Sequence, residues 1–115
     1  ILIDRFVDST VAYQHYGMNV DLKFINFINS FLIKNLKIKF TFLNIVSLKN
    51  MRIRLAKRKN LNRYDQFKVS FYRKVQNGFL KIFKKNKNNY MIIDSNKDIS
   101  FNKKIIISRI NKLLK

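Results

Sequence analysis

The chain has 115 residues, the size of one small domain with a single core. Apolar residues make up 47% of it, which excludes a disordered chain, and no apolar run approaches the roughly 20 residues of a transmembrane helix, which is therefore excluded as well. There is no cysteine, so disulfides and thiolate sites are excluded, and a reducing cytoplasm is the expected location.

A net charge of +19 is typical of proteins that bind nucleic acids, because Lys and Arg release counterions from phosphate backbones. Here the cations are spread along the chain, in "KNLKIK", "LAKRKN", "IFKKNKNN" and "FNKKIII", instead of forming one stripe with interleaved aromatics. The chain has no glutamate, and Lys, Asn and Ile are abundant throughout, which indicates compositional drift. A small basic nucleic-acid-binding module stays as the alternative function.

The first half of the chain predicts two strands and three helices. The apolar run "ILI" ahead of Asp4 predicts a short strand buried on both faces. A helical segment is predicted from Ser9 to about Tyr16, with Asp8 or Ser9 as N-cap. Asp21 is the predicted N-cap of the next helix, where apolar residues follow a helical repeat: Leu22, Ile25, Phe27, Ile28, Phe31 and Leu32. "KFTFLNIV" predicts a second buried strand, and "LKNMRIRLAKR" predicts a basic helix.

The second half begins with "KRKNLNRYD", a polar stretch without apolar periodicity that predicts an exposed loop. From Asp65, apolar side chains recur at steps of three or four and predict one long amphipathic helix through "FKKN": Phe67, Phe71, Val75, Phe79, Ile82 and Phe83. "NYMIID" predicts a third short strand. A closing helix is predicted in "SNKDISFNKKIIISRINKLLK", with an apolar stripe of Ile106, Ile110, Leu113 and Leu114.

Strands and helices alternate along the chain, which predicts parallel strands joined by right-handed crossovers in one α/β domain, residues 1–115. Three short parallel strands with flanking helices make an incomplete sheet, because such sheets normally need cover on both faces and at their edges. The P-loop pattern G-x-x-x-x-G-K-[ST] is absent from the sequence, whose only glycines are Gly17 and Gly78.

Polar side chains gather where the first predicted strand ends. Ligands of parallel sheets bind beyond the carboxyl ends of the strands, where Asp4 and Arg5 are expected. Arginine offers a planar fork of donors that matches a phosphate, whereas an Asp-Arg pair also occurs as a structural ion pair. Thr10, Tyr13 and Gln14 stand at i, i+3 and i+4. One helix face would therefore carry a hydroxyl, a phenol and an amide, groups that suit a base edge and a sugar.

The stretch "DRFVDSTVAYQHYG", from Asp4 to Gly17, closely resembles the signature of the thymidylate kinase family, which begins Asp-Arg-Tyr or Asp-Arg-His and runs on to Ser-(Ser/Thr)-x-Ala-Tyr-Gln-Gly. The resemblance continues in register over essentially the whole chain. "TFLNIV" is similar to the family's next strand, "LAKRKNLNRYD" to its lid, "FYRKVQNGFLKI" to the helix after the lid, and "YMIIDSNKDIS" to the last strand. The chain thus resembles the C-terminal part of a P-loop kinase, with the lid at about 55–66 and the P-loop in a segment ahead.

The resemblance implies a nucleoside monophosphate kinase that transfers the γ-phosphoryl group of ATP to dTMP, giving dTDP. It implies that this part supplies the dTMP site and the lid. Arg5 would hold the dTMP phosphate, and Ser9 and Thr10 would contact the nucleotide. Thr10 and Gln14 would lie at the thymine edge, and Tyr13 would pack where a ribose 2′-hydroxyl would otherwise fit, which favours deoxyribose.

The lid is implied to supply cations for the ATP phosphates: Arg58 and Arg63, together with Arg54. Asp4 would lie beside Mg²⁺ and the transferring group, so the implied catalytic residues are Asp4, Arg5, Arg58 and Arg63. Mg²⁺ would come with ATP and find its ligands largely in the segment ahead, with no metal site in this chain. The full-length protein would be a homodimer in the cytoplasm, with no membrane association and no specific nucleic-acid partner.

The sequence departs from the family pattern at several positions. Phe6 replaces the usual Tyr or His, His15 stands where Gly is usual, and Asn62 replaces the usual lid Asp before Arg63. In the family, the first strand lies between the Asp-Arg strand and the "TFLNIV" strand. Because this sequence lacks that strand and the P-loop, the part alone is expected to be inactive, poorly stable and prone to aggregation.

Overall fold

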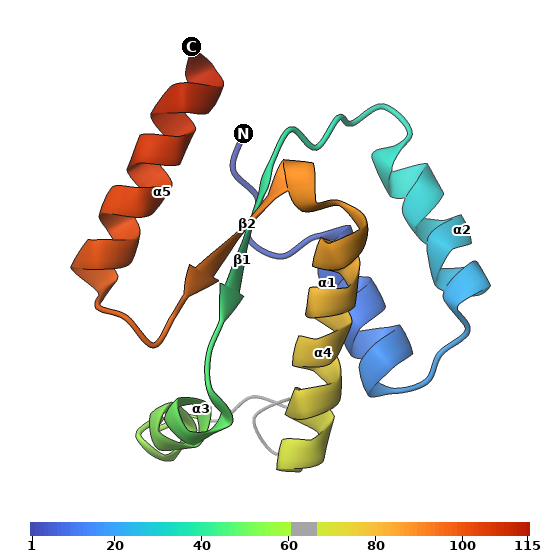
Figure 1. The fold of residues 1–115 in the computed structure, drawn as a ribbon. Helices are drawn as coiled ribbons and strands as arrows, with labels where there is room; N and C mark the ends of the chain where they lie inside the picture. Colours follow the sequence, from blue (N-terminus) through green and yellow to red (C-terminus); the bar gives the residue numbers. More distant parts are fainter. Residues whose placement is uncertain (61–66) are drawn as a thin grey trace.

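A computed structural model describes residues 1–60 and 67–115, and the two strands of its sheet run parallel (Figure 1). Strand β1 (Thr41–Ile45) pairs with β2 (Tyr90–Asp94), so that Thr41 lies opposite Tyr90 and Ile45 opposite Asp94. The remaining elements are, in chain order, α1 (Val7–Thr10), the π-helix η1 (Val11–Gly17), α2 (Leu22–Ile33), α3 (Leu48–Ala56), α4 (Val69–Lys85), the 3₁₀-helix η3 (Lys87–Asn89) and α5 (Ile99–Leu114). The parallel pairing predicted for the second and third strands is confirmed.

Capping explains where the first helices begin. Asp21 caps α2, because its carboxylate accepts a hydrogen bond of 2.9 Å from the backbone N–H of Phe24. This confirms the predicted cap. Helix α1 begins directly after Phe6 and has no side-chain cap, so Asp8 and Ser9 lie inside the helix and their prediction as caps is wrong.

The prediction of the first strand, at "ILI", is wrong. Residues 1–3 form no strand, and their side chains are exposed, Leu2 by 89%. A strand persists only where a neighbour accepts and donates its backbone hydrogen bonds, and within the described residues β1 and β2 pair with each other alone. The described fold is therefore α/β and mostly helical, with a two-stranded parallel sheet in place of the three strands expected.

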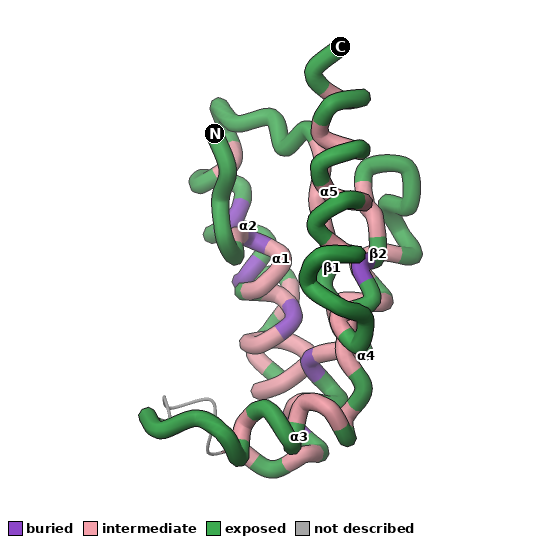
Figure 2. Tube along the Cα trace, turned by 90° about the vertical axis from the view of Figure 1, so that its left-hand side faces the viewer, coloured by how far each residue is buried: buried purple, intermediate pink, exposed green. Residues whose placement is uncertain are grey.

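The main apolar core lies between η1 and α4, beside the sheet (Figures 1 and 2). It confirms the apolar pattern of the long helix and consists of Ala12, which is 0% exposed, with Phe71 and Val75. The two glycines of the sequence lie at the same helix crossing. A Cβ atom at Gly17 would come within 2.7 Å of the Phe71 ring, and one at Gly78 within 2.6 Å of the Tyr16 ring. The two helices approach closely because neither has a side chain at these points.

Helix α5 stands on the other side of the strands from α4 and carries no buried residue (Figures 1 and 2). Two contacts hold it to the segment ahead of β1. The Arg109 guanidinium lies 4.6 Å from the centre of the Phe40 ring, and the Lys39 ammonium donates a hydrogen bond of 2.7 Å to the Leu113 carbonyl. The predicted stripe of α5 is half-buried except at Leu114, which is exposed. In the described ranges, no helix combines the length and the apolar character that a membrane span requires.

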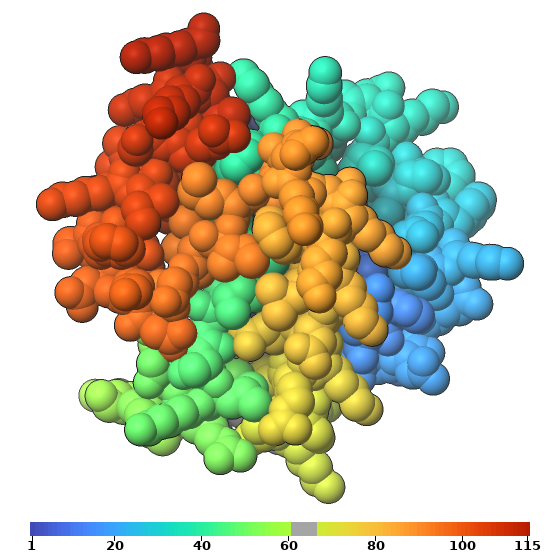
Figure 3. Space-filling view, in the orientation of Figure 1, coloured from blue at the N-terminus to red at the C-terminus, as the bar shows by residue number. Residues whose placement is uncertain are grey.

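Helix α2 carries apolar side chains on two sides. Ile25 is buried, 3% exposed, and its side packs toward α1 and η1. A second set recurs at helical spacing and remains exposed, Phe27 by 63% and Phe31 by 65%. We call this set the α2 face; it consists of Phe24, Phe27, Ile28, Phe31 and Leu32. In the space-filling view, α2 forms an outer border of the molecule (Figure 3).

Candidate functional site

Arg5 has an unusual backbone and lies over an aromatic ring. Its φ of 60° is left-handed, a conformation that costs a residue with a Cβ about 1–2 kcal/mol. The guanidinium carbon lies 5.4 Å from the centre of the Tyr13 ring, within the range of a cation–π interaction. Arg5 is exposed, so its fork of donors is accessible to an anion while one of its faces rests on the ring. The structure therefore brings these two predicted site residues together.

The Tyr13 ring is in turn held by two rings of α4. It is half-buried and meets Phe71 edge-on, with ring centres 6.0 Å apart and an interplanar angle of 61°. Its contact with Phe79 has a centre distance of 6.3 Å and an angle of 80°. Such edge-to-face geometry is favoured by the quadrupoles of aromatic rings. The sequence identifies both phenylalanines as core residues, but its periodicity gives no signal that they border a site residue.

The other predicted substrate residues lie in the same stretch without side-chain partners. Thr10 ends α1 and is exposed, whereas Gln14 belongs to the π-helix and is half-buried. A π-helix has i→i+5 hydrogen bonds, so positions i and i+4 are aligned less closely than in the α-helix that the sequence predicts. Asp4 is exposed and Ser9 half-buried. Within the described residues none of these four side chains forms a hydrogen bond or ion pair, and their roles toward a nucleotide stay predictions.

His15, where the family pattern has glycine, closes the end of η1. Its Nδ1 lies 2.8 Å from the Val20 carbonyl, which accepts the hydrogen bond. The backbone N–H of Val20 donates to the Gln14 carbonyl, also at 2.8 Å. The imidazole therefore fixes the turn that leads from η1 into α2.

The three predicted lid arginines lie in different surroundings. Arg54 lies in the last turn of α3, and its guanidinium donates a hydrogen bond to the Ser95 carbonyl directly after β2. Arg58 lies just beyond the end of α3 and is exposed. Arg63 and Asn62 lie outside the described residues. The structure thus puts Arg54 at the carboxyl ends of the strands, which is where ligands of parallel sheets bind.

Asn96 organises the polar groups at the ends of the strands. Its backbone N–H donates to the Asp94 carboxylate at 2.9 Å, the pattern of an Asx turn. Its side-chain oxygen accepts hydrogen bonds from the Ser47 backbone N–H at 3.0 Å and from the Asn50 amide at 2.8 Å. The loop after β2 is therefore tied to the start of α3. "DSN" after a strand is a signal for the turn, whereas the bonds across 46 and 49 residues leave no trace in the sequence.

A hollow of about 640 Å³ opens beside this loop, between the strand ends and α5. Its polar lining includes the cations Arg54, Lys97 and Lys103. Isoleucines form the apolar part: Ile93, Ile99, Ile106 and Ile107. Apolar walls with a few cations suit a ligand that has both a flat apolar part and negative charge.

Asp8 lies inside the "DRFVDSTVAYQHYG" stretch but is used structurally. Its carboxylate accepts a hydrogen bond of 2.5 Å from the Tyr90 phenol at the start of β2, which ties α1 to the sheet. Burial, and then the hydrogen bond to Asp8 and its negative charge, raise the pKa of Tyr90 well above the ordinary 10.0, although a hydrogen bond with Thr41 opposes this. The Asp8 carboxylate therefore has a hydrogen-bond partner, whereas the Asp4 carboxylate has none among the described residues.

A spectrophotometric titration of the full-length protein should show one tyrosine phenol that stays protonated at a pH where the other exposed phenols ionise. The folded state holds this proton more tightly than the unfolded state, so its contribution to stability is present below about pH 10 and lost at higher pH. Tyr90→Phe should remove both the late phenol and this loss of stability, whereas Tyr16→Phe should leave them. A wild-type protein whose tyrosines all ionise together would contradict the Asp8–Tyr90 assignment.

Comparison with known protein families matches residues 1–106 to the family described as thymidylate kinase. The chain belongs to the thymidylate kinase family. A thymidylate kinase of Sulfurihydrogenibium sp. (strain YO3AOP1) is 33% identical over 112 residues, which cover 97% of this chain and 54% of the relative. The thymidylate kinase of Acholeplasma laidlawii (strain PG-8A) is 30% identical over 115 residues, 99% of this chain and 57% of the relative.

The fold agrees with a solved thymidylate kinase. The crystal structure of thymidylate kinase from Ehrlichia chaffeensis superposes with a TM-score of 0.63 and 28% sequence identity, covering 94% of this chain and 48% of that one. The chain spans about half the length of the relatives that it matches. The resemblance carried by "DRFVDSTVAYQHYG" is thereby confirmed at the level of the thymidylate kinase family, and the roles of single residues stay predictions.

Proposed function

We propose that the full-length protein containing this chain is a dTMP kinase, which transfers the γ-phosphoryl group of ATP to dTMP and gives dTDP in the cytoplasm. This part, residues 1–115 of a single kinase domain, would supply the dTMP site and a lid at about 55–66. The observation that carries the proposal is the pair of Arg5 and Tyr13, with a guanidinium held over a ring in the family's signature stretch. A planar fork of donors beside an apolar surface suits a nucleoside monophosphate, whose phosphate and sugar need such different neighbours.

Arg5 would hold the dTMP phosphate, with Asp4 beside it at the transferring group. Ser9, Thr10, Tyr13 and Gln14 would contact the nucleoside. Phosphoryl transfer needs fixed positive charge around phosphate oxygens more than it needs covalent chemistry. The left-handed backbone of Arg5 supports such a fixed position, because a strained residue persists only where its surroundings hold it.

The ATP side of the proposal rests on Arg54 and the hollow at the strand ends. Arg54 would act with Arg58 and Arg63 on the ATP phosphates, and its place beside Lys97 at the strand ends supports this. Mg²⁺ would be bound mainly through the phosphates of ATP, as is usual for this ion. In the described part of the chain no three acidic, histidine or cysteine side chains cluster, and the exposed carboxylate of Asp4 fits a single neighbour of the metal.

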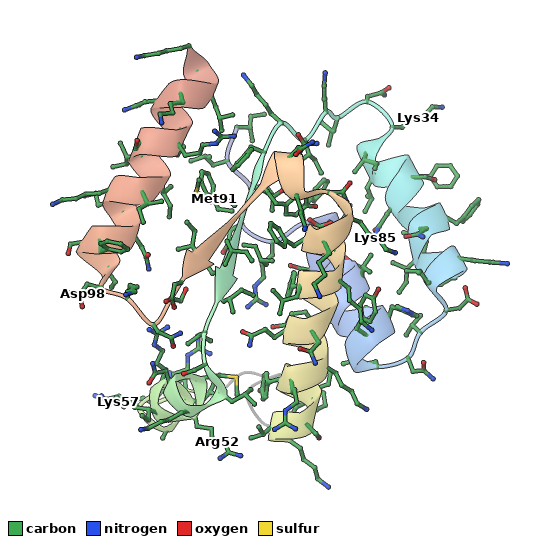
Figure 4. All side chains as sticks on the ribbon, viewed as in Figure 1. Lys34, Arg52, Lys57, Lys85, Met91 and Asp98 are labelled. Carbon is green, nitrogen blue, oxygen red and sulfur yellow. The ribbon has the colours of Figure 1, made fainter. Side chains whose placement is uncertain are left out.

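The basic side chains give no support to the alternative, a nucleic-acid-binding module. Among the labelled cations, Lys34 follows α2, Arg52 and Lys57 lie close together at α3, and Lys85 ends α4 (Figure 4). A backbone-binding surface would gather such cations along one groove or stripe. These four cations instead belong to three different helices.

The proposal is tested by assaying the full-length gene product with ATP, Mg²⁺ and one nucleoside monophosphate at a time. We expect dTDP and ADP to form from dTMP, with lower kcat/KM for dUMP and little turnover of dCMP or dGMP. The 1–115 chain alone should give no product, because it lacks a P-loop sequence. A full-length protein that leaves dTMP unphosphorylated would refute the proposed function.

We further propose that the full-length protein is a homodimer and that the α2 face contributes to its interface. The face is a contiguous exposed set of large apolar side chains on a helix at the border of the molecule (Figure 3). Surfaces of this kind mark contacts with other proteins. In an isologous contact the α2 face of one subunit would pack against the α2 face of the other, so that both faces are buried.

The double variant Phe27→Glu, Phe31→Glu is expected to shift the full-length protein from dimer to monomer in sedimentation-velocity experiments. Two buried carboxylates on each side of an apolar contact repel and lose their hydration. The matched control Asn26→Glu, on a polar side of the same helix, should remain a dimer. A double variant that is still dimeric would place the interface elsewhere.

A further inference from the structure

We propose that Phe71 and Phe79 of α4 are positioning residues for the phosphate-binding arginine, because they fix the Tyr13 ring on which the Arg5 guanidinium rests. This inference rests on the proposed function, in which Arg5 binds the dTMP phosphate. It assigns to two core residues a part in recognising the phosphate of a nucleoside monophosphate, although neither touches the substrate.

The Arg5 side chain needs support to keep one position. Its side chain is long and exposed, and such a side chain has many rotamers to lose when it binds an anion. The left-handed φ of 60° sets the direction in which the side chain leaves the backbone. The Tyr13 ring, 5.4 Å from the guanidinium carbon, then restricts the guanidinium before a ligand arrives.

The Tyr13 ring is itself supported by two side chains of α4. Tyr13 lies on the π-helix η1, and within the described structure the rings of Phe71 and Phe79 both meet it edge-on, at 6.0 Å and 6.3 Å. They stand eight residues apart on one face of α4, so the tyrosine ring contacts α4 at two levels. Contacts at two levels of another helix restrict how far the ring can tilt.

Phe71 and Phe79 are both held in place by the apolar core. Phe71 is buried in the core with Ala12 and Val75, and Gly17 of η1 lies directly against its ring. Phe79 packs against the same core. The position of the guanidinium therefore depends, through Tyr13, on the main apolar core.

The experiment compares the binding of dTMP and thymidine to the full-length protein by calorimetry. Thymidine lacks the phosphate, so the ratio of its dissociation constant to that of dTMP reports the Arg5 contact, whereas a shift shared by both ligands reports only the nucleoside contacts. In Phe71→Leu and Phe79→Leu, we expect this ratio to fall about two- to fivefold, the size of one exposed cation–π contact. Phe79→Tyr retains a ring and should restore the ratio to that of the wild type.

The matched control is Ile25→Val, which trims a buried residue of α2 that has no part in the aromatic contacts and should lower stability without changing the ratio. If Phe71→Leu does not fold, Phe79→Leu carries the test, because Phe79 is only half-buried. Equal losses of dTMP and thymidine affinity in the leucine variants would overturn the positioning role while leaving the kinase proposal intact. A wild-type protein that binds dTMP no more tightly than thymidine would instead overturn the assignment of Arg5, and the positioning role with it.

Discussion

Arg5→Ala in the full-length protein is expected to reduce kcat/KM for dTMP by at least about 10³-fold, to below detection in a standard coupled assay. A bidentate arginine–phosphate contact is charged, directional and made at the group that receives the phosphoryl, so its loss affects both binding and the transition state. Stability should change little, because alanine removes no buried contact and Arg5 is exposed. Thermal unfolding measured beside the assay separates loss of activity from loss of fold.

Two further variants test whether the loss of activity is specific to the Arg5 guanidinium. Arg5→Lys keeps the charge but not the planar fork, and we expect it to restore only a small part of the activity. Arg73→Ala, at an exposed position of α4 outside the proposed site, should keep wild-type turnover. Retained turnover in Arg5→Ala would refute the assignment of the phosphate contact to this residue.

The 115-residue chain alone is expected to unfold without a sharp cooperative transition and to aggregate at micromolar concentrations. The buried apolar residues of the described ranges are few: Val7, Ala12, Ile25, Leu43, Phe71, Val75 and Ile93. Large apolar side chains remain exposed on the N-terminal segment, on α2 and on α5. A two-stranded sheet is marginal in water, and both strands keep an unpaired edge within the described structure.

Binding of the dye ANS, near-ultraviolet circular dichroism and calorimetry would measure this property directly. The same measurements on the full-length protein of the proposal provide the comparison. A soluble 115-residue product with one cooperative melting transition and no dye binding would contradict the expectation.

Local signals in the sequence predict the elements well. The cap at Asp21 is read correctly from one acidic residue ahead of an apolar repeat, and the two paired strands are read from β-branched and aromatic runs. Helix α4 is predicted from steps of three and four, and Phe71 and Val75 are indeed buried. In each case neighbours within a few residues supply the physical cause.

The errors have a common origin in distant partners. "ILI" has the composition of a strand, but a strand exists only through its neighbour, and composition cannot show whether one is present. The π-helix form of η1 cannot be read from residue types, although Gly17 lies at its close approach to α4. Gln76 of α4 accepts a hydrogen bond of 3.1 Å from the backbone of Val46, 30 residues away, and no spacing rule connects the two.

For the site, the chemistry of the residues was more predictable than their arrangement. The sequence names both Arg5 and Tyr13 as site residues, but the contact between guanidinium and ring is found only in the structure. The role of Asp8 as a partner of Tyr90 could not be predicted, because the two residues are 82 positions apart. Arg54 was expected over ATP phosphates, and its bond to the Ser95 carbonyl shows that the loop after β2 is already within its reach.

The close crossing of η1 and α4 limits how far the composition of this chain can drift. Lysine, asparagine and isoleucine have spread over loops, helix surfaces and strands alike, and each of them has a side chain too large for positions 17 and 78. Substitutions to these three amino acids are therefore tolerated sterically at exposed positions but not at this contact. Any larger residue there would push η1 away from α4, so the two glycines mark positions where a change of composition meets a geometric limit.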